Sequence, residues 1–218
     1  MSQVCHPICL FGAGGHGCGV ASQIASVTGR VPIFADEMLP LGTELAGTSV
    51  RFAKLEEIGE HPLIVTIGSA VRRRAVQERA VALGLSVTYF VADVGHYFAA
   101  PPGPGAVVLA GSIVNSGADI SEGVIVNCGA IVEHGCRIGA YSHVAPGAVI
   151  AGDVELGADV WIGANATVLQ GLSICAGTMI GAGAVVTKAI MVPGVYVGQP
   201  ARRIDLPRGI PGEEGVSE

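Results

Sequence analysis

The stretch GVIVNCGAIVEHGCRIGAYSHVAPGAVIAG, residues 123–152, repeats one pattern every six residues. An aliphatic residue recurs in it at Val126, Val132, Ile138, Val144 and Ile150. The same period extends outward on both sides without an insertion, from 108 to 186. All 14 positions of this series are Val, Ile or Leu: Val108, Val114, Ile120, Val126, Val132, Ile138, Val144, Ile150, Leu156, Ile162, Val168, Ile174, Ile180 and Val186.

The residue after the aliphatic position is often small or turn-forming, as at Asn115, Asn127, Gly139, Ala145, Ala151, Gly157, Gly163 and Gly181. A short strand followed by a sharp corner needs such a residue. Three corners close a triangular coil of about 18 residues, with the aliphatic side chains stacked along its axis. The period therefore predicts a parallel β-helix of four to five coils. An ordinary β-sandwich would show a period of two instead.

Composition excludes several classes of protein. The chain has 33 glycines in 218 residues, is 50% hydrophobic and only 5% aromatic, and lacks the Gly period of collagen. A net charge of −6 argues against a nucleic-acid partner. No apolar run of about 18 residues and no basic leader is present, so we expect a cytoplasmic protein without a membrane partner. The six cysteines form no CxxC pair and are interpreted as reduced.

The first half of the chain has a different character. Strand-like segments at 7–11, 31–36, 63–68 and 87–91 alternate with helical segments at 18–27 and about 70–83. This alternation predicts a small Rossmann-like βαβ sheet. The change of pattern at the Pro/Gly-rich segment 101–105 divides the chain into three parts. We expect a Rossmann-like domain at 1–100, a β-helix domain at 101–206 and a flexible, acidic tail at 207–218.

A glycine motif follows the first predicted strand. Gly12, Gly14 and Gly17 match the dinucleotide-binding fingerprint, and Asp36 lies where a ribose-binding acid belongs. Such glycines let the backbone and a helix N-terminus approach phosphate. The domain is small for a full NAD fold, so a nucleotide sugar is favoured, with NAD or a purely structural turn as alternatives. His16 would face the phosphates or the sugar, or is simply a helix-start residue.

Three consecutive arginines, at 72–74, stand in the second predicted helix. We interpret this run as a solvated helix face rather than a phosphate clamp.

The repeat half holds two histidines, His134 and His143, nine residues apart. Half a coil separates them, so they lie on different faces of one subunit and could meet only across a boundary between subunits. A zinc site needs about three ligands, so no metal is expected. A single neutral histidine can act as a general base without a metal. Glu133, Asn127 and Ser142 are polar neighbours that could orient it.

Several segments together carry a resemblance that covers nearly all of residues 7–205. These are FGAGGHG (11–17), ADE (35–37), IGS (67–69), EHGCRIG (133–139), YSH (141–143) and GVYVGQPAR (194–202). With them, the chain resembles the left-handed β-helix sugar O- and N-acetyltransferases. These include the sialic acid O-acetyltransferase and the enzymes that N-acetylate UDP-linked 4-amino-4,6-dideoxy sugars or GDP-perosamine.

The resemblance implies a homotrimer of left-handed β-helices, with acetyl-CoA in the groove between neighbouring helices. His134 matches the catalytic base. The residues that match nucleotide-sugar contacts are Gly14, Gly15, His16, Asp36, Glu37, Gly68 and Asn127. Those that match the acetyl end and the pantetheine path of the cofactor are His143, Gly152, Ala164 and Ala182.

One position departs from the resemblance. Members of the family often carry an acid directly after the catalytic base, where this chain has Gly135. Either another carboxylate, with Glu133 as the catalytic candidate, supports His134, or His134 works unaided.

The expected function is transfer of an acetyl group from acetyl-CoA to the amino group of a UDP- or GDP-linked 4-amino-4,6-dideoxy sugar. The amine attacks directly in a ternary complex, with His134 as general base. Three alternatives stay open: a sugar O-acetyltransferase, a metal-dependent hydratase with a third histidine ligand, and a non-catalytic hexapeptide-repeat binding protein.

Overall fold

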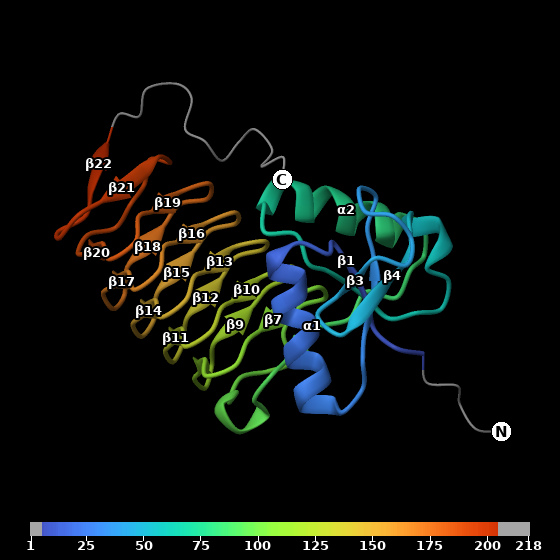
Figure 1. Cartoon of the computed structure of the whole chain (residues 1–218). Coiled ribbons are helices and arrows are strands. Elements are labelled where there is room, and N and C mark those ends of the chain that lie inside the picture. The colour runs from blue at the N-terminus through green and yellow to red at the C-terminus, as the bar shows by residue number, and fades with distance from the viewer. Residues whose placement is uncertain (1–5, 205–218) are drawn as a thin grey trace.

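The computed structural model describes residues 6–204 and divides into a sheet-and-helix part and a long β-helix (Figure 1). The N-terminal part holds a five-stranded sheet in the order β3-β4-β2-β1-β5, of which β4, β2, β1 and β5 run parallel. The strands are β1 (Cys9–Phe11), β2 (Ile33–Ala35), β3 (Glu44–Leu45), β4 (Thr48–Phe52) and β5 (Leu63–Val65). The βαβ prediction is therefore confirmed, and β3 and β4 are additions to it.

Two helices cover opposite faces of this sheet. Helix α1 (Gly15–Thr28) packs one face together with the β-helix, and α2 (Ala70–Ala82) covers the other face with the 3-10 turn η1 (Leu55–Glu57). The predicted α1 began three residues too late, because its first turn uses the glycine motif itself. Ser69 caps the N-terminus of α2, where its hydroxyl accepts from the Arg72 N–H and satisfies one free donor of the first turn.

The β-helix consists of two-residue strands that form three parallel sheets, each strand pairing with the strand 18 residues further on. The first sheet, which we call face 1, contains β6 (Phe90–Val91), β7 (Val107–Val108), β10 (Ile125–Val126), β13 (His143–Val144), β16 (Trp161–Ile162) and β19 (Met179–Ile180). Face 2 contains β8 (Ile113–Val114), β11 (Ile131–Val132), β14 (Val149–Ile150), β17 (Thr167–Val168) and β20 (Val185–Val186). Face 3 contains β9 (Asp119–Ile120), β12 (Arg137–Ile138), β15 (Glu155–Leu156) and β18 (Ser173–Ile174).

The axis of the β-helix is filled by the hexad aliphatics. All 14 predicted positions are buried and belong to one hydrophobic cluster. Each strand ends on one of these residues, and the following corner turns the chain to the next face. The 18-residue register and the axial core confirm the fold predicted from the six-residue period.

The segment 87–91 differs from its prediction. It was expected as the last strand of the N-terminal sheet, but only Val87 bridges to Leu63 there. Phe90–Val91 instead pairs with Val107–Val108 as the first rung of face 1. This segment therefore belongs to both halves, because a strand at the edge of one sheet can continue into the next one.

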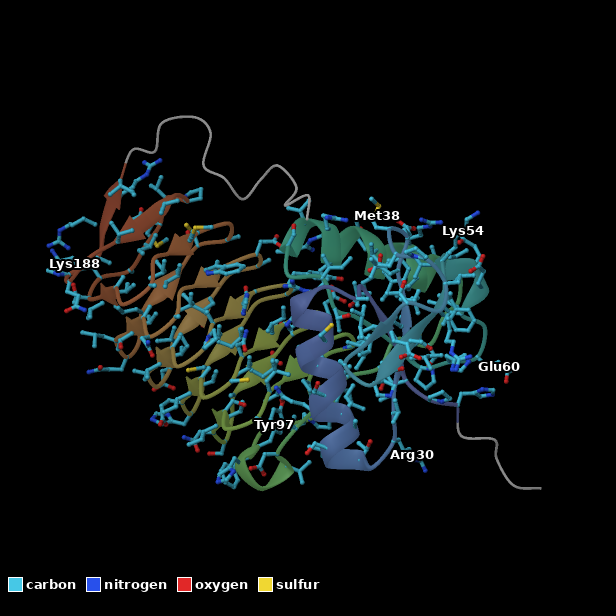
Figure 2. The ribbon with its side chains drawn as sticks, viewed as in Figure 1. Arg30, Met38, Lys54, Glu60, Tyr97 and Lys188 are labelled. Carbon is cyan, nitrogen blue, oxygen red and sulfur yellow. The ribbon has the colours of Figure 1, made fainter. Side chains whose placement is uncertain are left out.

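The far end of the β-helix closes with a hairpin. Strand β21 (Val195–Val197) pairs parallel with β19 and antiparallel with β22 (Arg202–Ile204). A 3-10 turn, η2 (Val94–His96), lies near the opposite end. Figure 2 shows Lys188 at the far end of the β-helix and Met38 on the N-terminal part. The predicted tail at 207–218 lies outside the described residues, and within 6–204 no helix is long and apolar enough to cross a bilayer.

Candidate functional site

The glycine motif forms a tight strand-to-helix turn at the carboxyl end of β1. Gly12 has φ +108, a conformation that favours glycine. A Cβ on Gly17 would overlap the carbonyl oxygen of Gly12, so the helix start and the strand end touch only because position 17 has no side chain. The Thr66 hydroxyl donates to the same carbonyl at 2.7 Å. Gly14 and Gly15 remain exposed at the first turn of α1, where a helix N-terminus favours an anion.

The two acids predicted to contact the ligand lie beside this turn. Oxygen atoms of Asp36 accept from the backbone N–H groups of Ala13 (2.8 Å), Met38 (2.8 Å) and Leu39 (3.2 Å). The Asp36 carboxylate therefore ties the glycine turn to the loop after β2. Glu37 points outward and pairs with Arg79 at 3.5 Å.

Arg73 is buried, which corrects the interpretation of the arginine run as a solvated face. Only 1% of Arg73 is exposed, and its guanidinium donates to four carbonyl oxygens: Gly123 (2.8 Å), Tyr141 (2.6 Å), Ile67 (2.8 Å) and Gly68 (2.8 Å). Two of these belong to the β-helix and two to the loop after β5. Burial lowers the pKa of Arg73 to about 10, so the side chain stays charged at neutral pH.

Arg72 and Arg74, which flank Arg73, differ from it. Arg72 is exposed, as the sequence analysis expected. Arg74 pairs with Asp159 at 2.7 Å and stacks over the ring of Tyr141. Sequence reasoning missed the inward position of Arg73 because a helical period places only one of three consecutive residues on the packed face.

His16 and His143 come together where the two halves of the chain meet. His16 is the second residue of α1, and His143 lies on β13 with its ring edge against Trp161, centroids 4.4 Å apart. Burial first, then the charge of Arg73, lowers the pKa of His16 to about 4. Burial, then Arg73 and His16, lowers the pKa of His143 to about 3. Both rings are therefore neutral at physiological pH.

The hydrogen bonds of Asn127 define which nitrogen of His143 carries the proton. Asn127 Oδ1 accepts from the Cys128 N–H at 2.8 Å, so its Nδ2 group faces His143 Nε2 at 3.0 Å. Nδ2 is a donor, hence Nε2 accepts and the ring proton sits on Nδ1. Nδ1 of His143 and Nε2 of His16 are buried and have no partner within residues 6–204. Two buried ring nitrogens thus lack a hydrogen-bond partner among the described residues, at the point where the two halves of the chain meet.

His134 lies elsewhere, on the corner between faces 2 and 3. Its side chain is 63% exposed, and its ring covers Gly152, where a Cβ would come within 2.5 Å of Cε1. Asp153 approaches Nδ1 of His134 at 3.9 Å. Glu133 instead accepts from Asn115 Nδ2 at 2.9 Å and from the His134 backbone N–H at 3.4 Å. The structure therefore places Asp153, not Glu133, at the imidazole.

The remaining predicted cofactor contacts of the β-helix also lie either on the corner of Asn127 or on the corner of His134. Ala164 and Ala182 lie one coil apart on the corner between faces 1 and 2, above Asn127. Gly152 lies with His134 on the next corner. Ser142, considered as an orienting neighbour, bonds instead to Gly157 O at 2.9 Å and Val160 N at 3.0 Å. One chain thus carries two separate groups of predicted residues, one around His134 and one around His143, which we call half-sites. In the described part of the chain, no group of three or more metal-ligating side chains occurs.

Comparison with known proteins identifies the repeat and its relatives. Residues 153–188 match the model described as "Bacterial transferase hexapeptide (six repeats)". No curated protein sequence matches the chain. Solved structures do, over 91% of its length.

Three of these structures are similar to the chain over 91% of its length. The acetyltransferase domain of PglB from Neisseria gonorrhoeae FA1090 is 29% identical to this chain and matches it over 100% of the domain's own length, with a TM-score of 0.80. A second structure of that domain contains acetyl coenzyme A. PerB from Caulobacter crescentus, in complex with CoA and GDP-perosamine, is 29% identical and 97% covered, with a TM-score of 0.81. WeeI from Acinetobacter baumannii AYE is 26% identical and fully covered, with a TM-score of 0.76. The predicted fold class and the predicted resemblance are confirmed.

Proposed function

We propose that this chain, an acetyltransferase built on a left-handed β-helix of hexapeptide repeats, acetylates the amino group of a nucleotide-linked 4-amino-4,6-dideoxy sugar. Acetyl-CoA is the acetyl donor. The observation that carries the proposal is the likeness over 91% of the chain to PerB, whose structure holds both CoA and GDP-perosamine. The likeness covers 91% of the chain, which is more than the β-helix alone, so it includes much of the N-terminal part as well.

The glycine turn is assigned to the nucleotide diphosphate. The exposed Gly14 and Gly15 leave the first N–H groups of α1 open to phosphate, and the helix dipole favours its negative charge. Asp36 supports this role indirectly, since its carboxylate holds the turn in place. Gly68 is positioned on the neighbouring loop by Arg73. The sugar then lies toward His16, Asn127 and His143.

The chemistry requires a neutral amine, a base and a stabilised oxyanion. The amine nitrogen attacks the thioester carbon, and His134 takes a proton from that nitrogen as the C–N bond forms. The C–S bond then breaks and coenzyme A leaves as the thiolate. Backbone N–H groups of the groove, with His143 beside them, stabilise the developing oxyanion. This route involves no covalent enzyme intermediate.

The two half-sites combine if neighbouring copies pack corner to corner. The exposed His134 of one copy would then face His143 and Asn127 of the next, which is the arrangement expected of a homotrimer. Gly152 on one wall and Ala164 and Ala182 on the other leave room for a pantetheine chain between the copies. Copies mutated separately at His134 and His143 should therefore regain partial activity when co-expressed, and no regain would place the whole site within one chain.

The function is tested by coenzyme A release from acetyl-CoA with UDP-, GDP- and dTDP-linked 4-amino sugars. We expect one acceptor to be turned over, and His134→Asn to be at least about a hundredfold slower, because general-base catalysis contributes that much. His96→Asn is the matched control, since His96 is exposed and, among residues 6–204, its side chain pairs only with Asp93. Turnover of sugar hydroxyls alone would favour the O-acetyltransferase alternative.

A further inference from the structure

Gly135, directly after His134, has no side chain, yet the space where one would lie is filled. A Cβ built on Gly135 would overlap Oδ1 of Asp153. Asp153 comes from the next coil, 18 residues further along the chain, and its backbone N–H donates to the His134 carbonyl at 2.9 Å. The same Oδ1 atom lies 3.9 Å from Nδ1 of His134. A carboxylate thus reaches the imidazole from a neighbouring coil.

We propose that Asp153 is the positioning residue of His134: its carboxylate accepts from Nδ1–H, holds the proton on that nitrogen, and leaves Nε2 free to act as the base. This inference rests on the proposed function of His134. The tautomer of a histidine is set by the hydrogen bond that its other nitrogen makes. A distance of 3.9 Å shortens to a hydrogen bond by a small side-chain rotation, and catalytic hydrogen bonds are often long before substrates bind.

The backbone at Asp153 supports this role. Equivalent positions of the same corner in other coils are Gly117, Gly135 and Gly171, and all four residues have positive φ. Glycine is the usual residue in this conformation, and aspartate adopts it at a moderate cost. Asp153 has φ +58 and is therefore the exception in its column, at the coil where its side chain meets His134.

The other ionisable side chains near the His134 ring, Glu133 and Cys136, are engaged elsewhere, so Asp153 is the acidic group that faces the ring. Glu133 is bonded to Asn115 and to the His134 backbone, on the other side of the corner. Cys136 is buried and donates to the Ala151 carbonyl, and burial raises its pKa, so it stays a neutral thiol. Gly152 supplies the floor on which the imidazole lies.

The test uses Asp153→Gly, which restores the residue used in the rest of the column and so keeps the turn intact, with Glu133→Gln as the matched control. Long-range ¹H–¹⁵N spectra of the labelled full-length protein at pH 8 report which nitrogen of His134 is protonated, with His134→Asn for assignment. We expect Nδ1–H in the parent and in Glu133→Gln, and a shift toward Nε2–H in Asp153→Gly. An unchanged tautomer in Asp153→Gly, or a shift only in Glu133→Gln, would overturn the proposal.

The same variants are then compared in acetyl transfer. We expect kcat to fall about tenfold in Asp153→Gly while KM for acetyl-CoA stays within about twofold, because the base is misprotonated and the cofactor groove is unchanged. An unchanged kcat, or a loss that appears only in KM, would overturn the positioning role. The spectra need no acceptor sugar. A tautomer shift without any acetyl transfer would therefore refute the proposed function alone.

Discussion

Replacing Arg73 by methionine should loosen the joint between the two halves of the molecule. The guanidinium is 1% exposed and donates to four carbonyl oxygens, two on each side of the joint. Methionine fills much of the same volume but leaves these oxygens without that donor. Leaving a buried acceptor without its donor costs about 1–3 kcal/mol, so the loss of a donor shared by four oxygens should lower the free energy of unfolding by about 3–5 kcal/mol.

Urea unfolding followed by circular dichroism measures this loss. With a urea dependence of about 2–3 kcal/mol per M, the midpoint of Arg73→Met should fall by about 1–2 M. Arg72→Met is the control, because Arg72 is exposed on the preceding position of the same helix and should change stability by about 0.5 kcal/mol or less. Arg73→Lys should lie between the two, since an ammonium keeps the charge without the planar fork of donors.

The joint also carries the Ile67–Gly68 loop, so nucleotide affinity is a second readout of Arg73→Met. We expect weaker binding of the nucleotide diphosphate in calorimetry, even well below the unfolding transition. An unfolding midpoint equal to that of the parent would refute the reasoning. An equal loss in Arg72→Met would refute it as well, because the effect would then belong to the helix surface.

Three further predictions follow from the same geometry. The pKa values of His16 and His143, about 4 and about 3, lie below the unfolded value of 6.5, so stability is retained above pH 6.5 and lost as the pH falls toward 4. Each histidine should contribute about 1.4 kcal/mol per pH unit, and urea unfolding at pH 7 and 5 should show a smaller loss in His143→Asn than in the parent. Gly17→Ala should abolish nucleotide binding in calorimetry, because its Cβ meets the strand-end carbonyl, whereas Gly19→Ala, with open space around it, should bind normally. Gly152→Ala should lower kcat about tenfold or more by displacing the His134 imidazole, the proposed base, with little change in melting temperature, since only the end of an exposed side chain must move.

The β-helix could be predicted almost completely from the sequence. The aliphatic positions from Val108 to Val186 follow one period because each coil repeats the same three corners. An insertion that shifted this register would move the aliphatic side chains out of the axial core. The N-terminal sheet was predicted at its centre but not at its edge. Strands β3 and β4 form a hairpin, and β4 joins the sheet by pairing with β2, a partner that is distant in the sequence. Phe90–Val91 changed sheets because its new neighbour, β7, comes later in the chain.

The site was predicted less completely than the fold. The roles of His134, His143 and Asn127 stay predictions, and the sequence offers them because imidazole and amide groups are side chains that can carry such chemistry. Arg73 was missed because its function depends on backbone carbonyls, which have no signature in a sequence. Asp153 was also missed, although a signal existed: it stands one coil, 18 residues, after Gly135, and residues with that spacing stack on each other throughout this fold.

The segment 87–91, which belongs to both halves, determines where coils could be added to the β-helix. Val87 bridges to Leu63 in the sheet, and Phe90–Val91 forms the first rung of face 1. A ligand bound at the glycine turn, as proposed, would therefore be held at a fixed height along the β-helix axis, level with the coils of Asn127 and His143. Whole coils added between His143 and the far end would lengthen the β-helix without changing the position of His143 relative to the glycine turn. A coil inserted between β7 and His143 would move His143 away from that turn. Insertions of 18 residues should therefore be tolerated at the far end of the β-helix but not next to the N-terminal part.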